Sequence, residues 1–204
     1  MKCALLANSN KKLIIFFNGW GMDETIVSHL DREDYDVLVL YDYRTLDFDL
    51  SKYNLEQYSE KYIVAWSMGV MVSTMFDFGK INHSTAINGT LKPIDDNFGI
   101  PTKIYKLTVR GFNEKSSQKF MERMFKEKPP IDKFSSRDLE SKKEELIALM
   151  NYQAKDSKTF DRVIVSDSDN IIPTNNQLNY WQNPEIIESG HCPFFKYNSW
   201  KDLL

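Results

Sequence analysis

The segment Ala65-Trp66-Ser67-Met68-Gly69 decides the fold expected for this chain. It follows the apolar run Tyr62-Ile63-Val64 and precedes a helix-like run from Val70 to Phe76. A serine with a small residue two positions away on either side, at a strand-to-helix corner, is the pattern of a nucleophile elbow. Small side chains at positions 65 and 69 let the turn close tightly, so that the Ser67 hydroxyl stands clear of the sheet. The pattern therefore predicts Ser67 as a nucleophile.

Short apolar segments on both sides of this corner predict the strands of a central sheet. Helix-like stretches at 24–30, 70–78 and 175–181 lie between most of them. Strands that alternate with helices favour right-handed crossovers and a parallel sheet, so we expect an α/β fold with a mostly parallel central sheet flanked by helices. The expected strands are Leu13–Phe17, Tyr35–Tyr41, Tyr62–Ala65, Ser84–Asn88, Phe160–Val165 and Glu185–Glu188.

Residues 91–160 interrupt this alternation. They contain helical patterns around 114–126 and 139–153 but no convincing strand. We expect one domain over residues 1–204, with a core of 1–90 and 160–204 and a helical lid insertion at about 91–159. In this kind of architecture, an insertion at this position forms a lid over the active site. The extra helices could also simply pack on the core, and the two interpretations are compatible.

Two further segments supply the partners that a nucleophilic serine needs. Asp169 follows the expected strand 160–165, and His191 follows the expected strand 185–188. The chain order Ser, Asp, His is that of the α/β-hydrolase triad. Ser67 would attack a carbonyl, His191 would take its proton, and Asp169 would orient the imidazole. Asp167 is a rival for the role of the acid, but a proline four residues after Asp169, at Pro173, favours Asp169.

Two backbone N–H groups are expected to form the oxyanion hole. The Met68 N–H stands at the start of the helix after the elbow. The second donor is the Trp20 N–H, because Asn18-Gly19-Trp20-Gly21 follows the first predicted parallel strand and glycines on both sides allow close approach.

Each of these residues also has a purely structural interpretation. Ser67 alone would more often be a helix N-cap, Asp169 could cap the helix after Pro173, and His191 could be an ordinary loop histidine. Trp20 could be only a packing residue. The occurrence of all the pieces in order, each after a strand, favours the catalytic interpretation.

Composition narrows the class of protein. A formal net charge of −3 argues against a general nucleic-acid binder, and no apolar stretch approaches the ~20 residues of a membrane span. Cys3 and Cys192 have no metal-ligand spacing and are expected to be free thiols in a reducing cytosol. We therefore expect a cytoplasmic monomer that binds no metal, no nucleic acid and no membrane.

The chain resembles a known family, the BioG-type pimeloyl-acyl-carrier-protein methyl ester esterases of the α/β-hydrolase superfamily. The resemblance spans residues 11–195. It is carried by Phe16–Met22, Tyr41–Arg44, Ala65–Val70 and the stretch from Ala86 to Pro101. One departure is Ser166, which stands where many hydrolases have a glycine three residues before the acid, and it leaves the choice between Asp169 and Asp167 open.

The resemblance implies hydrolysis of the methyl ester of a pimeloyl chain carried on acyl carrier protein, in biotin synthesis and without a cofactor. Residues 101–128 carry eight Lys or Arg against three Glu, which suits an acidic carrier. Lys115, Lys119 and Arg123 share helical spacing and are the expected docking residues. Two alternatives stay open. These three residues could form only a solvated helix face, and the carrier could instead dock near Arg44 or Arg110.

Other functions stay open from the sequence alone. The main one is a different acyl esterase or thioesterase of the same fold that acts on short acyl chains. A non-catalytic scaffold and a cofactor-free haloperoxidase or C–C hydrolase are less favoured, because the triad residues are intact and nothing points to the latter chemistries.

Overall fold

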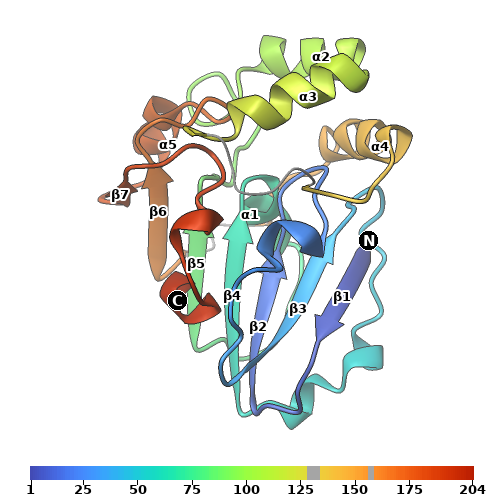
Figure 1. Ribbon diagram of the computed structural model, residues 1–204, viewed down its shortest axis with the longest axis vertical. Coiled ribbons are helices and arrows are strands. Elements are labelled where there is room, and N and C mark those ends of the chain that lie inside the picture. The colour runs from blue at the N-terminus through green and yellow to red at the C-terminus, as the bar shows by residue number, and fades with distance from the viewer. Residues whose placement is uncertain (128–133, 156–158) are drawn as a thin grey trace.

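The computed structural model describes residues 1–127, 134–155 and 159–204. Within these residues, seven strands form one sheet in the order β1-β3-β2-β4-β5-β6-β7 (Figure 1). β1 is antiparallel to β3, and all the other neighbours are parallel. The strands are β1 (Lys2–Leu6), β2 (Lys12–Phe17), β3 (Tyr35–Tyr41), β4 (Glu60–Trp66), β5 (His83–Ile87), β6 (Arg162–Ser166) and β7 (Glu185–Ile187).

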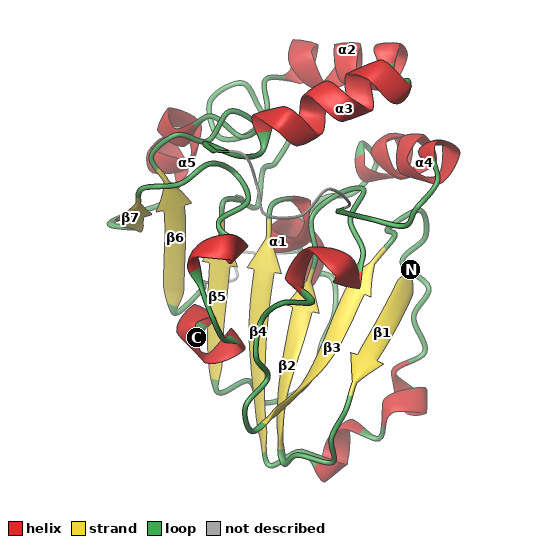
Figure 2. Ribbon diagram, viewed as in Figure 1, coloured by secondary structure: helices red, strands yellow, loops and turns green. Residues whose placement is uncertain are grey.

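Helices surround the sheet unevenly (Figure 2). One short helix, α1, follows β4, while three helices lie in the chain between β5 and β6. The helices are α1 (Met68–Ser73), α2 (Thr102–Gly111), α3 (Glu114–Arg123), α4 (Leu139–Leu149) and α5 (Thr174–Tyr180). Single 3-10 turns are η1 (Glu24–Val27), η2 (Leu50–Tyr53), η3 (Leu55–Gln57), η4 (Phe194–Lys196) and η5 (Trp200–Leu203).

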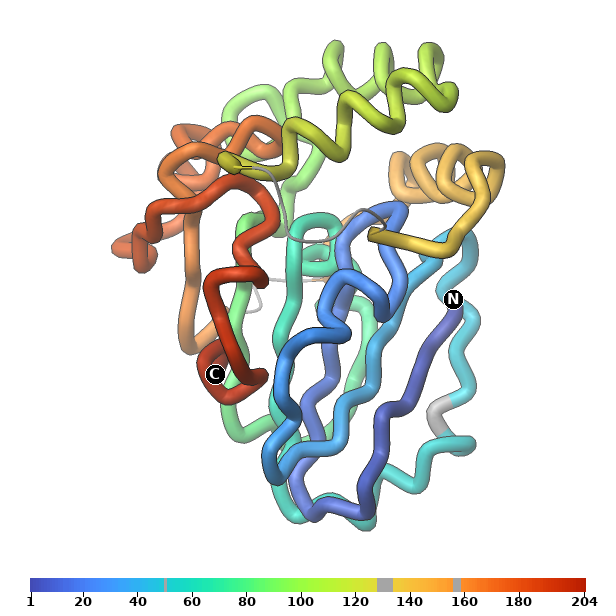
Figure 3. The backbone as a smooth tube through the Cα atoms, viewed as in Figure 1, coloured from blue at the N-terminus to red at the C-terminus, as the bar shows by residue number. Residues whose placement is uncertain are grey.

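Both faces of the central strands are buried, which explains their continuous apolar runs. Alternate residues of β2 divide between two cores: Ile15 and Phe17 join the cluster that contains the α1 residues, and Ile14 and Phe16 join the other. The second cluster is completed by η1 and by the C-terminal 3-10 turns, whose chain crosses that face of the sheet (Figure 3).

The parallel strands deliver their carboxyl ends to one edge of the sheet. In Figure 1, α2, α3, α4 and α5 all gather at that edge. Active sites of open α/β sheets form there, because loops from several strands converge. The three helices between β5 and β6 fall in the segment predicted as a lid, of which 128–133 and 156–158 lie outside the described residues. Their action as a lid stays a prediction.

The predicted α/β fold is confirmed, and the six predicted strands are present with ends shifted by up to two residues. β1 and α2 were not predicted. β1 is a half-exposed edge strand of five residues, too short for a clear alternation. α2 buries only Tyr105 and contains several β-branched residues, which weaken its helical pattern. The helix predicted at 24–30 is only the short turn η1.

Candidate active site

Ser67 lies at a sharp corner between β4 and α1. Its backbone adopts φ 58° and ψ −124°, a conformation that costs a non-glycine residue about 1–3 kcal/mol. Two glycines make the corner possible. A Cβ on Gly69 would lie 2.3 Å from the Phe17 carbonyl oxygen, and one on Gly89 would lie 2.4 Å from the Ser67 carbonyl oxygen. The expected need for a small residue at 69 therefore has a direct steric cause, while the need at 89 was not foreseen.

The structure brings Ser67, His191 and Asp169 into one line of hydrogen bonds. Ser67 Oγ lies 2.9 Å from His191 Nε2, and His191 Nδ1 lies 2.7 Å from Asp169 Oδ2. All three residues are buried, with 5%, 1% and 6% of their surfaces exposed. In this arrangement the imidazole can accept the serine proton at Nε2 while its Nδ1–H donates to the carboxylate.

Both carboxylate oxygens of Asp169 accept hydrogen bonds. Its Oδ1 accepts from the Ile171 and Ile172 backbone N–H groups at 2.8 and 3.0 Å. Its Oδ2 accepts from Gln177 Nε2 at 2.8 Å as well as from His191. Gln177, on α5, is completely buried and was not singled out by sequence reasoning. No sequence pattern marks it, because its partner is defined only by the packing of α5 against the loop.

Asp167 points away from this line. Its side chain is 40% exposed, accepts from the Ser189 N–H at 3.2 Å, and lies 3.8 Å from Lys126 Nζ. A hydrogen bond from Ser168 is the main reason that the Asp167 pKa is below its ordinary value. The rival acid is therefore an exposed loop carboxylate without contact to His191.

Asn88 explains the unusual serine at position 166. Its Nδ2 donates to Ser166 Oγ at 2.7 Å, and its Oδ1 accepts from the Ser166 N–H at 2.7 Å. The same Nδ2 lies 2.9 Å from the His191 carbonyl oxygen, which also accepts from Trp66 Nε1 at 2.8 Å. Asn88 thus ties the ends of β5 and β6 to the histidine loop, a role that a glycine at 166 would support less well.

The two residues whose backbone N–H groups are predicted to form an oxyanion hole, Trp20 and Met68, line the same pocket as Ser67. The Met68 N–H belongs to the first helical residue of α1, so it has no partner within the helix. Among the described residues, the Trp20 N–H also has no hydrogen-bond acceptor. The Trp20 ring packs edge-to-face against Phe112 and Phe120, with centroids 5.2 and 4.7 Å away. Trp20 therefore contributes both a free N–H and part of the wall of the site.

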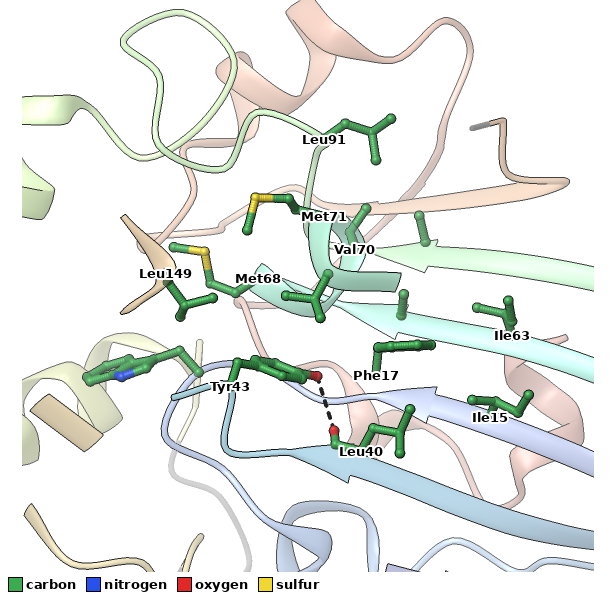
Figure 4. Close-up of a cluster of buried hydrophobic side chains, with 14 of the residues drawn as sticks. Ile15, Phe17, Leu40, Tyr43, Ile63, Met68, Val70, Met71, Leu91 and Leu149 are labelled. Carbon is green, nitrogen blue, oxygen red and sulfur yellow. Dashed lines mark hydrogen bonds between the residues drawn. The ribbon is translucent and has the colours of Figure 1, made fainter. Parts of the chain in front are cut away.

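The pocket beside Ser67 is small, with a volume of about 40 Å³. Trp20, Met68, Tyr105, Phe120 and Arg123 line it together with the Ser67–His191 pair. A larger cavity of about 650 Å³ lies beyond the Met68 and Met71 side chains, between α2 and α4, and does not reach Ser67. Figure 4 shows Met68, Met71 and Leu149 packed together there. The residues Ser67, His191, Trp20 and Met68 line the smaller pocket and not the larger cavity, so the smaller pocket is the candidate site of the reaction.

The predicted docking residues lie together on one helix. Lys115, Lys119 and Arg123 are exposed on α3, and Arg123 Nη2 donates to the Asn170 carbonyl oxygen at 2.5 Å. The helix ends at Arg123, so Lys126 is not on it and pairs instead with Glu188 at 2.9 Å.

The two alternative docking positions differ. Arg110 is exposed on α2, whereas Arg44 is held by Asp42 at 2.8 Å and Glu144 at 2.7 Å. Those bonds leave Arg44 little capacity for a partner.

Three other expectations from the sequence concern the two cysteines, metal binding and membrane-spanning helices. Cys3 and Cys192 are free, and burial raises the pKa of the Cys192 thiol well above its ordinary value. Across the described residues, no cluster of three or more His, Cys, Asp or Glu side chains is arranged to hold a metal ion. In the same part of the chain, no helix has the length and apolar character needed to cross a membrane.

Comparisons with known proteins identify the family of this chain. The family model described as pimeloyl-ACP methyl esterase BioG matches residues 1–203. The crystal structure of BioG from Haemophilus influenzae superposes with a TM-score of 0.87 at 33% identity, covering 100% of this chain and 99% of that one. An esterase from Exiguobacterium antarcticum, with a TM-score of 0.70 over 95% of this chain and 89% of that one, is 14% identical and shows only the shared fold.

The chain also matches part of a longer relative. A Bacteroides fragilis protein named malonyl-[acyl-carrier protein] O-methyltransferase is 40% identical over 182 residues, which is 84% of this chain. The chain spans only 37% of that protein. The family model covers nearly the whole chain, and the Haemophilus influenzae structure covers all of it. This chain therefore belongs to the BioG family of α/β-hydrolase esterases.

Proposed function

We propose that this protein hydrolyses the methyl ester of pimeloyl-acyl carrier protein methyl ester, giving pimeloyl-acyl carrier protein and methanol, in biotin synthesis. The observation that carries the proposal is the unbroken series of hydrogen bonds from Ser67 through His191 to Asp169, next to two free backbone donors. Membership of the BioG family supplies the substrate class. The name of the Bacteroides relative refers to a malonyl group on the same kind of carrier, which supports a carrier-bound substrate.

Acylation begins when Ser67 Oγ attacks the ester carbonyl carbon and His191 Nε2 accepts the serine proton. The oxygen that gains negative charge is held by the Trp20 and Met68 N–H groups; such donors are typically worth about 10²–10³-fold in rate each. The C–O bond to the methoxy group then breaks, and His191 returns its proton to the leaving group, so that methanol departs. Ser67 is left as an acyl ester.

Deacylation repeats these steps with water. His191 takes a proton from a water molecule, whose oxygen attacks the acyl carbon, and the same two N–H groups hold the second oxyanion. The bond to Ser67 Oγ then breaks and the serine recovers its proton from His191. The product is a free carboxylate. Asp169 accepts from the imidazole Nδ1–H throughout and stabilises the imidazolium that forms in both halves.

Product mass distinguishes this reaction from its alternatives. We expect incubation with pimeloyl-acyl carrier protein methyl ester to lower the mass of the acylated carrier by one CH₂ group. A thioesterase of the same fold would instead release the carrier with a free pantetheine thiol. An unchanged carrier, with rapid hydrolysis of short p-nitrophenyl esters, would indicate an esterase for another acyl substrate and contradict the proposal.

We further propose that the carrier docks on α3. Reversing Lys115 and Lys119 to Glu should lower kcat/KM for the carrier-bound ester while leaving a small ester nearly unaffected, because both side chains are exposed and line no part of the site. Added salt should weaken the wild-type preference for the carrier, since the Debye length is about 8 Å at 0.15 M. Rates on both substrates, measured over a range of salt concentrations, test this.

Two further variants complete that experiment. Arg123→Glu is assayed separately, because Arg123 also lines the pocket. Lys52→Glu with Lys80→Glu, two exposed lysines away from α3, makes the same change in net charge and should not alter carrier specificity. Equal losses for the two double variants would mean that net charge, and not a docking face, governs the encounter.

A further inference from the structure

The oxyanion loop is held at two backbone positions, one on each side of Trp20. The Gly19 N–H donates to Asn18 Oδ1 at 2.8 Å, and the Gly21 N–H donates to Glu145 Oε2 at 3.0 Å. Only the Trp20 N–H between them lacks an acceptor among the described residues. The direction of that free donor is therefore set by the two peptides that flank it, and one of these is fixed by a side chain from α4.

Glu145 is a buried carboxylate surrounded by donors. It is completely inaccessible to solvent and accepts from the Tyr43 N–H at 2.8 Å and from Arg137 Nη1 at 2.6 Å, as well as from Gly21. Arg137, only 4% exposed, also lies 3.1 Å from Asp42. Burial raises the pKa of Glu145, and the charge of Arg137 acts in the opposite direction. Burying this carboxylate costs desolvation, and in return it gives the Gly21 N–H a fixed acceptor.

Two more contacts join the same loop to the segment that contains α4. Trp20 Nε1 donates to the Lys142 carbonyl oxygen at 2.7 Å. Asp23, also buried, accepts from the Ser136 N–H at 2.6 Å. The loop that follows β2 is thus attached to α4 and the residues before it at three points. In Figure 1, α4 lies above the ends of β2 and β3, on the side of the sheet edge away from α5.

We propose that Glu145 is a positioning residue of the oxyanion hole, an inference that rests on the proposed function. By holding the Gly21 N–H, it fixes the peptide that follows Trp20, so that the Trp20 N–H meets the developing oxyanion without rearrangement. It follows that α4 must be docked on the core when the oxyanion forms.

Replacement by glutamine cannot reproduce these contacts. One carboxylate oxygen accepts from Tyr43, and the other accepts from Gly21 and Arg137. An amide NH₂ in either position would face at least one N–H donor. Glu145→Gln should therefore shift the loop. A displacement of about 1 Å at a reacting group can cost about 10²-fold in rate, so we expect kcat to fall by up to that factor.

The test uses a short p-nitrophenyl ester, so that carrier docking has no influence. For Glu145→Gln we expect a lower kcat with little change in KM, because the oxyanion hole acts in the transition state. An alkyl boronic acid, whose tetrahedral adduct with Ser67 places an oxygen in the hole, should bind more weakly by the same factor as kcat/KM. Glu144→Gln is the matched control: it lies one residue away, is 49% exposed and pairs with Arg44. Glu144→Gln should keep the wild-type kcat and the wild-type affinity for the boronic acid.

A second variant separates positioning from folding. Replacing both members of a buried ion pair avoids leaving one charge buried without its partner, so Arg137→Met with Glu145→Leu should lose less Tm than Glu145→Leu alone, although the Tyr43 N–H also loses its acceptor. The double variant still provides no acceptor for Gly21, and we expect the same loss of kcat and of boronate affinity. Wild-type kcat in this folded double variant would overturn the proposal. A higher KM with unchanged kcat would overturn it too, since Glu145 would then shape the pocket only.

The same assays show which proposal fails. An active wild-type protein whose Glu145 variants are equally active contradicts only the positioning role. A wild-type protein that hydrolyses no ester contradicts the proposed function, and the positioning role falls with it.

Discussion

Ser67→Ala is expected to abolish ester hydrolysis while the protein remains folded. The substitution removes the atom that attacks the carbonyl and takes away one hydrogen bond, the 2.9 Å contact with His191 Nε2. In comparable enzymes, loss of a triad nucleophile costs about 10⁶-fold in kcat. The measurement is hydrolysis of both the carrier-bound methyl ester and a short p-nitrophenyl ester, with Tm recorded for the same preparation.

A matched control is available on the helix that follows the elbow. Ser73 is also completely buried, and its hydroxyl donates to the Val70 carbonyl oxygen at 2.9 Å, away from His191. Ser73→Ala removes the same hydroxyl group from the core and should keep turnover near that of the wild type. If Ser67→Ala retained near-normal turnover, Ser67 would not be the nucleophile, and the proposed mechanism would be wrong.

The fold was predictable because its central strands are buried on both faces. Apolar runs such as Leu13–Phe17 and Val37–Tyr41 indicate such strands when turn residues bound them. Local signals were weaker where burial is partial. β1 is an edge strand of five residues without a clear alternation. The sequence of α2 is amphipathic, so this helix was missed although its pattern was present, in a segment rich in β-branched residues.

The residues predicted for the site lie where local motifs can mark them, at the ends of strands. Ser67 stands in a turn with its own size requirements, and His191 and Asp169 each follow a strand. Gln177 and Glu145, which lie within helices, carry no such signal. Each contacts the site across at least 8 residues of sequence, and for Glu145 the separation from Gly21 is 124 residues. Contacts of this kind depend on packing and cannot be read from spacing.

The choice between Asp169 and Asp167 illustrates the same limit. Both carboxylates follow β6, and the spacing to Pro173 was the only sequence argument for Asp169. The structure places the two side chains in different surroundings, one buried beside His191 and the other 40% exposed beside Lys126. This difference leads to a prediction with a large expected effect.

Asp169→Asn should lower kcat by about 10⁴-fold, as the corresponding change does in a well-studied serine protease. The physical reason is specific to this site, because the Asp169 carboxylate is the acceptor in all four of its hydrogen bonds. If the asparagine oxygen faces His191, its NH₂ opposes the Ile171 and Ile172 N–H groups. If the NH₂ faces His191, the imidazole must place its proton on Nε2, where it can no longer accept the proton of Ser67.

Asp167→Asn is the comparison that decides the assignment. It removes the same charge two residues away, from a side chain whose backbone contact with the Ser189 N–H an amide oxygen can keep. Surface changes of this kind usually alter stability by less than about 0.5 kcal/mol, so turnover should stay near that of the wild type. Measuring kcat for both variants on one small ester tests the ranking. The reverse ranking would transfer the role of the acid to Asp167, whereas two equally mild effects would show that His191 works without a carboxylate partner.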